Sequence, residues 1–187
     1  MLNFAGTVLL VFVCGLVSFK AEFQQQRAKV VHVNPKYVKF ASIFTTRRSR
    51  SSPYTTDMNM TTLSALGNNV TTRIMYYKVK AKSDAMVIEL KICDMFNTKW
   101  AKDWIEKYSN MTTDTCPLKA GSYRFSGFEL PPKNFPLLVL ADKNSDYEST
   151  FLAYATKTKE PIIEFSVGLS YKSIPKLKRN KSFYEKL

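Results

Sequence analysis

The sequence is poor in the residues that most enzymes use for catalysis. Its 187 residues contain one histidine and three cysteines. A Ser-His-Asp or Cys-His arrangement would depend on His32, which lies in a short apolar run typical of a β-strand. None of the six glycines forms a dinucleotide fingerprint, a P-loop or a nucleophile elbow. A zinc site would lack clustered His and Cys ligands. We predict a protein that is not an enzyme and uses no cofactor or metal; an enzyme would need a cleft around paired carboxylates or around His32.

Only one long apolar run occurs, from Thr7 to Phe19. It is shorter than the stretch of about 20 apolar residues that spans a bilayer, and it has the length of a signal-peptide core. We predict that residues 1–21 are a cleaved secretory leader, so that the mature protein is extracellular and has no transmembrane segment. The alternatives are an uncleaved anchor or a buried apolar segment.

Secretion changes the interpretation of the three cysteines. Cys14 lies within the leader, so Cys93 and Cys116 remain as an even pair in an oxidising compartment. We predict a disulfide between them, which would add about 3 kcal/mol of stability. The alternative is two free thiols. Four N-x-S/T sequons agree with secretion and are predicted glycosylation sites: Asn59, Asn69, Asn110 and Asn180.

Positive charge is in excess, with 28 Lys and Arg against 15 Asp and Glu, a formal net charge of +13. Such a surface attracts anions. The Arg-rich segment 47–50 is interpreted as a solvated loop, with a processing site or an anion-binding patch as alternatives. The basic residues 173–187 are predicted to form a loose tail. No basic-aromatic module of a nucleic-acid-binding protein occurs, and we predict no nucleic-acid partner.

Period-2 alternation of apolar residues dominates the rest of the chain and predicts β-strands. It is clearest over Met86–Ile92 and Ile163–Tyr171. About eight strands without recurring helices predict an all-β protein, an antiparallel β-sandwich or β-cup that forms one domain over residues 22–172. The weaker strand candidates are Val30–Val33, Tyr37–Thr45, Thr71–Lys82, Ser122–Leu130, Leu137–Ala141 and Ser149–Thr156.

One segment between the two cysteines breaks the alternation. From Met95 to Tyr108, aromatic residues recur every four positions, which is helical spacing and predicts one helix laid across the sheets. Two interpretations of the aromatic stripe stay open: a face that packs on a filled core, or a wall of an apolar ligand cavity. The cavity candidates are Phe96, Trp100, Trp104 and Tyr108 on the helix, with Phe165, Val167 and Leu169 on the last strand.

Several segments resemble one protein family. The strand end IELKICDMF, the helix end KYSN and the stretch CPLKAGSYRFSGFEL are similar to those of insect secreted Che-type chemosensory proteins and their uncharacterised relatives. These are grouped with the ML lipid-recognition superfamily, which includes the ganglioside-activator protein. The resemblance implies a β-cup with an apolar space between two sheets. Many relatives carry more cysteines than this chain.

These observations favour one function and leave a second open. The first is extracellular binding of a hydrophobic small molecule, a lipid or a pheromone-like compound, in insect chemosensation. The second is a cationic extracellular module that binds acidic glycans, a membrane or a protein partner through its surface. Binding by surface charge would weaken with salt, whereas burial of a neutral apolar ligand would not.

Overall fold

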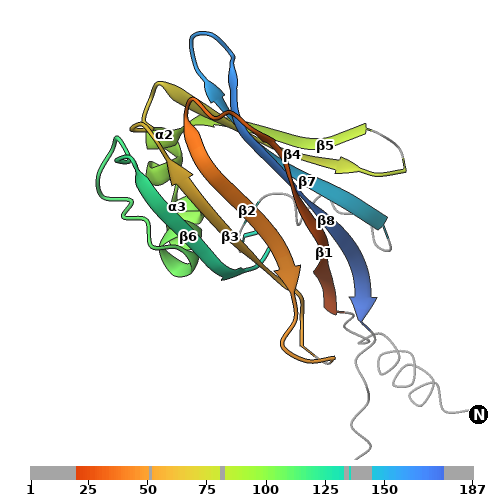
Figure 1. Cartoon of the computed structure of the whole chain (residues 1–187). Helices are drawn as coiled ribbons and strands as arrows, with labels where there is room; N and C mark the ends of the chain where they lie inside the picture. The colour runs from red at the N-terminus through yellow and green to blue at the C-terminus, as the bar shows by residue number, and fades with distance from the viewer. Residues whose placement is uncertain (1–19, 51, 81–82, 133–134, 136–144, 175–187) are drawn as a thin grey trace, which may run out of the picture.

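Two antiparallel β-sheets face each other and enclose the core (Figure 1). A computed structural model describes residues 20–50, 52–80, 83–132, 135 and 145–174. This architecture confirms the predicted all-β sandwich. The larger sheet has the order β1 (Lys20–Val33), β8 (Pro161–Ile174), β7 (Ser145–Ala155), β4 (Val70–Lys78) and β5 (Ser83–Lys91), and the smaller has the order β2 (Val38–Thr46), β3 (Thr55–Thr62) and β6 (Gly121–Phe128).

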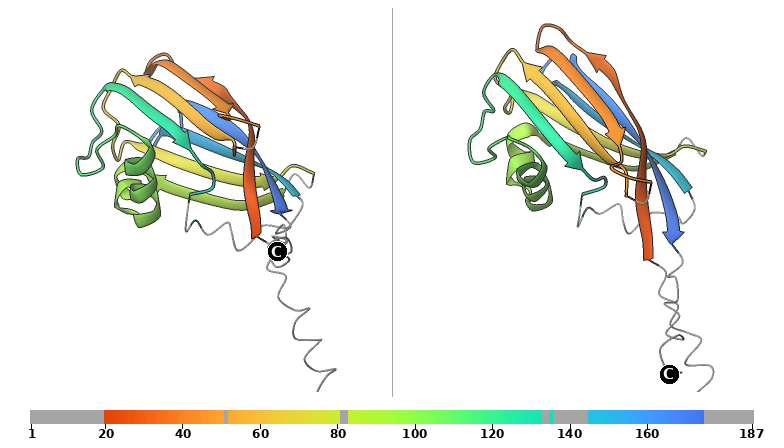
Figure 2. Two further views of the ribbon diagram at one scale, coloured as in Figure 1. Left: turned by 90° about the horizontal axis from the view of Figure 1, so that it is seen from below. Right: turned by 60° about the horizontal axis from the view of Figure 1, so that its bottom comes forward.

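The two sheets are joined differently along their two sides. On one side, consecutive strands β1 and β2 lie at adjacent sheet edges and contact each other. On the other side, the helical segment lies beside β6 and contacts the end of β5 (Figure 2). The helices therefore cover the gap between the edge strands of the two sheets.

Apolar rows run across the inner face of the larger sheet because neighbouring strands are in register. Ile74 lies opposite Phe151, and Phe151 lies opposite Phe165. The two phenyl rings stack at 4.8 Å between centroids. Cross-strand aromatic pairs of this kind stabilise a sheet beyond the area that they bury.

Strand β3 was not expected from the sequence. Its segment TTDMNMTT contains Asp and Asn, which are depleted in strands. The strand forms because Met58 and Met60 point inward, while the inward hydroxyls of Thr56 and Thr62 have hydrogen-bond partners. Counting β3, the described residues hold eight strands. The predicted strand Leu137–Ala141 lies outside the described residues.

Strand β1 is also longer than predicted. It extends back to Lys20 through a run of polar residues that had been assigned no structure. Gln25 explains this extension, because its side chain is 2% exposed and reaches the smaller sheet. Its amide nitrogen donates to the Phe128 carbonyl at 2.9 Å, and its oxygen accepts from the Thr56 hydroxyl at 2.5 Å. Lys20 and Ala21, the last two residues of the predicted leader 1–21, pair in β1 with Ile174 and Ser173 of β8.

The helical segment is two short helices and not the single helix predicted. Helix α2 covers Ile92–Asn97 and helix α3 covers Lys99–Tyr108. Thr98 interrupts them with an extended backbone, φ −85° and ψ 117°. Its hydroxyl donates to the Asp94 carbonyl at 2.9 Å, a local bond that competes with helix continuation. The carbonyl of Thr98 then accepts the first hydrogen bonds of α3.

The predicted disulfide is confirmed. Cys93 lies in the first turn of α2, and Cys116 lies in the loop before β6, with 5.7 Å between their Cα atoms. The bond closes the chain that contains both helices. It therefore ties the end of β5 to the approach to β6, across the side of the sandwich that the helices cover.

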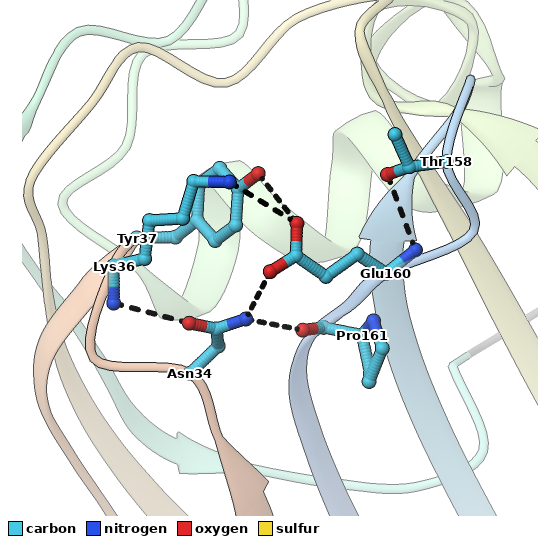
Figure 3. Close-up of polar contacts among 6 residues, drawn as sticks. All are labelled: Asn34, Lys36, Tyr37, Thr158, Glu160 and Pro161. Atoms are coloured by element: carbon cyan, nitrogen blue, oxygen red, sulfur yellow. Dashed lines mark hydrogen bonds and ion pairs between the residues drawn. The ribbon is translucent and has the colours of Figure 1, made fainter.

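A polar cluster joins the β1–β2 turn to the β7–β8 turn (Figure 3). The carboxylate of Glu160 accepts hydrogen bonds from Asn34 at 3.0 Å, Tyr37 at 3.0 Å and Lys36 at 3.2 Å. Asn34 also donates to the Pro161 carbonyl at 3.1 Å. Donors from Asn34, Tyr37 and Lys36 hold the pKa of the Glu160 carboxyl below its ordinary value of 4.5.

We expect Glu160→Gln to have a lower thermal midpoint than the parent protein at neutral pH. This difference between the two midpoints should shrink as the solution becomes acidic. The folded-state pKa of Glu160 is depressed, so its contribution is present above the ordinary value of 4.5 and is lost as the pH falls below it. Thermal melts of both proteins across this range test the effect. Glu129→Gln, at an exposed site outside the cluster, is the control. A difference between Glu160→Gln and the parent that is constant with pH would contradict the linkage.

Candidate functional site

An apolar cavity of about 120 Å³ lies between the two sheets and beneath the helices. We call it the intersheet cavity. The two sheets and the helices form most of its wall, and the loops add Leu66, Met111, Leu118, Leu130, Pro132 and Phe135. The smaller sheet contributes Val38, Met58, Met60, Phe125 and Phe128. The larger sheet contributes Ile74, Tyr76, Phe151, Ile163, Phe165 and Val167. The helices contribute Ile92, Met95, Phe96, Trp100, Ala101, Trp104 and Ile105.

The hydroxyls in this wall already have partners. The Thr72 hydroxyl donates to the Leu90 carbonyl at 2.9 Å, and Thr62 accepts from the Gly121 amide at 3.2 Å. The hydroxyls of Tyr76 and Ser149 hydrogen-bond to each other. Burial raises the pKa of Tyr76 far above its ordinary value of 10.0, so the phenol stays neutral. The cavity wall therefore holds no charged side chain, and its hydroxyls already have partners.

Five of the seven residues proposed from the sequence line this cavity. They are Phe96, Trp100, Trp104, Phe165 and Val167. The other two lie elsewhere. Tyr108 borders a surface cleft beside Lys107, and Leu169 is 0% exposed in the packed part of β8.

The two tryptophans separate the cavity from this surface cleft. Trp100, Trp104 and Pro132 line both spaces. The Trp104 indole nitrogen donates to the Glu129 carbonyl at 3.0 Å, which fixes the ring from the solvent side. Trp100 packs edge-on against the buried ring of Phe135, with 4.8 Å between centroids. The aromatic stripe is thus both a packing face and a cavity wall.

Sequence reasoning missed the part of the wall that comes from the smaller sheet. Met58 and Met60 were missed with strand β3. Phe125 and Phe128 both point inward although they are three residues apart, because a register shift separates their pairings with β3. Gly127, at φ +61°, lies within that irregularity. A glycine inside a strand pattern is the one local signal that indicated it.

Cavity size limits what fits without rearrangement. A cavity of about 150 Å³ with an aliphatic and aromatic lining binds benzene, whereas drug-sized ligands occupy about 300 to 1,000 Å³. At about 120 Å³, the intersheet cavity takes one ring or a short branched chain. Four methionines in the wall give it room to adjust, because their side chains are unbranched and flexible. They are Met58, Met60, Met95 and Met111.

In the part of the chain that the structure describes, no three His, Cys, Asp or Glu side chains come together as metal ligands would. Over the same residues, no helix has the length and apolar character needed to cross a bilayer.

In comparisons with known proteins, no protein-family model matches the chain and no curated protein is a significant match. The resemblance to the insect chemosensory family therefore stays a prediction.

Proposed function

We propose that this protein binds an apolar small molecule in the intersheet cavity. The observation that carries the proposal is a void of about 120 Å³ whose wall is apolar and whose hydroxyls are all partnered. At about 24 cal/mol per Å³, a void of this size costs about 3 kcal/mol when it is left empty. A ligand that fills it recovers dispersion contacts with the wall and buries its own apolar surface.

The chemistry of the wall defines the ligand class. The buried group must be neutral and free of hydrogen-bonding atoms, because a polar atom inside would lose its water without gaining a partner. A polar end would have to lie outside, in the surface cleft beyond the tryptophans, where Asp103, Lys107 and Glu129 line the space. Extracellular carriage of a lipid or a contact pheromone in insect chemosensation, which the family resemblance implies, is part of this proposal.

We expect Ala153→Leu to abolish ligand binding and to raise the free energy of unfolding by about 0.5 to 2 kcal/mol, as cavity-filling substitutions do. Ala153 lines the cavity and is 4% exposed, so the larger side chain enters the void. Binding is followed by tryptophan fluorescence, because both tryptophans of the chain line the cavity. The titrants are neutral apolar compounds, from a single aromatic ring to a long-chain hydrocarbon.

Ala155→Leu is the matched control. Ala155 lies two residues further along the same strand and packs against the core, but it is not part of the cavity wall. If the core were filled, Ala153→Leu would instead lower the free energy of unfolding by about 1 to 3 kcal/mol, because the larger side chain would overpack it. That loss, together with unchanged fluorescence for every compound tested with the parent protein, would refute the proposal.

A second candidate function rests on the β2–β3 loop. Arg47, Arg48 and Arg50 are all exposed there, and the Arg47 guanidinium lies 5.0 Å from the centre of the exposed Tyr54 ring. This arrangement favours an anionic partner such as an acidic glycan. Retention on a heparin column that falls steeply with salt would support it, whereas binding in the cavity would not depend on salt.

A further inference from the structure

The outer face of the smaller sheet carries an apolar patch on its edge strand. Phe40 and Phe44 of β2 are 54% and 47% exposed. Both rings lie on the same face as Ser42, because strand residues two and four apart point the same way. β2 is the outermost strand of the three-stranded sheet, and exposed apolar rings side by side on a sheet face invite association with another chain. We call Phe40 and Phe44 the outer phenylalanines.

A sequon lies between these two rings on the neighbouring strand. Asn59 of β3 pairs with Ser42, whereas Phe40 pairs with Thr61 and Phe44 with Asp57. Asn59 is therefore the diagonal neighbour of both outer phenylalanines. Diagonal neighbours on one sheet face lie about 7 to 8 Å apart, within reach of aromatic and long side chains. A group attached to the Asn59 amide would rest on the two rings.

The side chain of Asn59 differs from those of the other sequons that the structure describes. The Asn69 oxygen accepts from the Gly67 amide at 2.8 Å. The Asn110 side chain accepts from the Arg124 amide at 2.8 Å and donates to the Ser122 carbonyl at 3.3 Å. Among the hydrogen bonds of the described residues, none involves the Asn59 side chain, which is partly exposed. Asn180 lies outside the described residues.

We propose that Asn59 carries an N-linked glycan whose first sugars cover the outer phenylalanines and keep this apolar patch from associating with a second copy of the chain. The inference rests on the secretory route that is part of the proposed function. A glycan is large and strongly hydrated, and the C–H faces of its sugars contact aromatic rings. Its placement on the central strand β3 lets it cover the apolar part of the neighbouring edge strand while its far end stays in water.

The test uses the full-length protein secreted from insect cells. Peptide mass spectrometry before and after enzymatic release of glycans identifies each occupied asparagine, because release converts it to Asp. We expect Asn59 to be occupied in the parent and in Thr61→Ser, which keeps the sequon. Asn59→Gln and Thr61→Ala remove the sequon in two different ways, and both are expected to lose this glycan.

Self-association is then measured by light scattering at matched concentrations. The parent and Thr61→Ser are expected to remain monomeric, whereas Asn59→Gln and Thr61→Ala form dimers or larger species. Adding Phe40→Ser and Phe44→Ser to Asn59→Gln should restore the monomer, because the apolar patch is then gone. The triple variant separates exposure of the patch from a general loss of solubility.

Three outcomes would overturn the inference. The first is an unmodified Asn59 in a sample in which Asn69 or Asn110 carries a glycan, which refutes the inference and leaves secretion standing. The second is an occupied Asn59 whose removal leaves the monomer fraction unchanged. A sample without a glycan at any sequon would refute the inference together with the predicted secretory route.

Discussion

Trp104→Ala is expected to lower the free energy of unfolding by about 3 kcal/mol, the lower end of the range for removing a large aromatic side chain, because the indole is partly exposed. The indole packs against Phe125 at 5.4 Å and Phe128 at 5.2 Å between ring centroids, and it contacts Tyr108 at 6.0 Å. Trp104 is one of the residues through which helix α3 packs on the smaller sheet. Its loss enlarges the cavity and weakens the packing of the helix on β6.

Denaturant unfolding of Trp104→Ala and Trp104→Phe measures this effect. Trp104→Phe keeps an aromatic ring and loses the hydrogen bond to the Glu129 carbonyl. We expect it to retain most of the stability, with a loss of about 1 kcal/mol for the bond. If Trp104→Ala lost no more than Trp104→Phe, the ring would not be a packed part of the core, contrary to the structure.

Replacing both Cys93 and Cys116 with Ser is expected to lower the free energy of unfolding by about 3 kcal/mol. The bond joins residues 23 positions apart, and in the chain-entropy model its main effect is to restrict the unfolded chain. The loss should be largest for the helical side of the sandwich, because the closed loop contains α2 and α3.

Unfolding of the double Ser variant is compared with that of the parent protein under reducing conditions. The two should agree, because both lack the cross-link. Hydrogen exchange gives a second readout, with protection expected to fall first in α2 and α3. Equal stability of the double variant and the oxidised parent would show that the bond is absent or contributes nothing.

The local patterns of the sequence predicted the elements whose cause is local. Alternation located β5 and β8, and the four-residue spacing of the aromatics located the helical segment. The break at Thr98 was missed because it depends on one threonine bonding backward within an otherwise helical pattern. Strand β1 was missed over its polar half because the partners of Gln25 are distant in sequence.

The candidate site could be predicted only in part for a related reason. The four-residue spacing of the aromatics identified the cavity residues on the helices. Whether a cavity forms, however, depends on how the two sheets and the helices pack against one another. The wall residues from β3 and from the irregular end of β6 fall outside any regular pattern. The alternation in β8 predicts that Phe165 and Leu169 both point inward and does not distinguish them. In the structure, Phe165 lines the cavity and Leu169 is packed away from it.

The large effect expected for Trp104 determines where ligand binding should be tested. In a variant that lacks Trp104, loss of ligand binding could not be distinguished from loss of the fold. Ala153 avoids this problem, because its substitution removes the cavity without removing a contact.

The most direct test of the central claim is mass spectrometry of the protein secreted from insect cells, both intact under native conditions and after organic extraction. We predict one bound apolar compound per protein chain, recovered in the organic extract and absent from Ala153→Leu. A parent protein that is empty in the native spectrum, and whose tryptophan fluorescence responds to none of the apolar compounds, would contradict the claim.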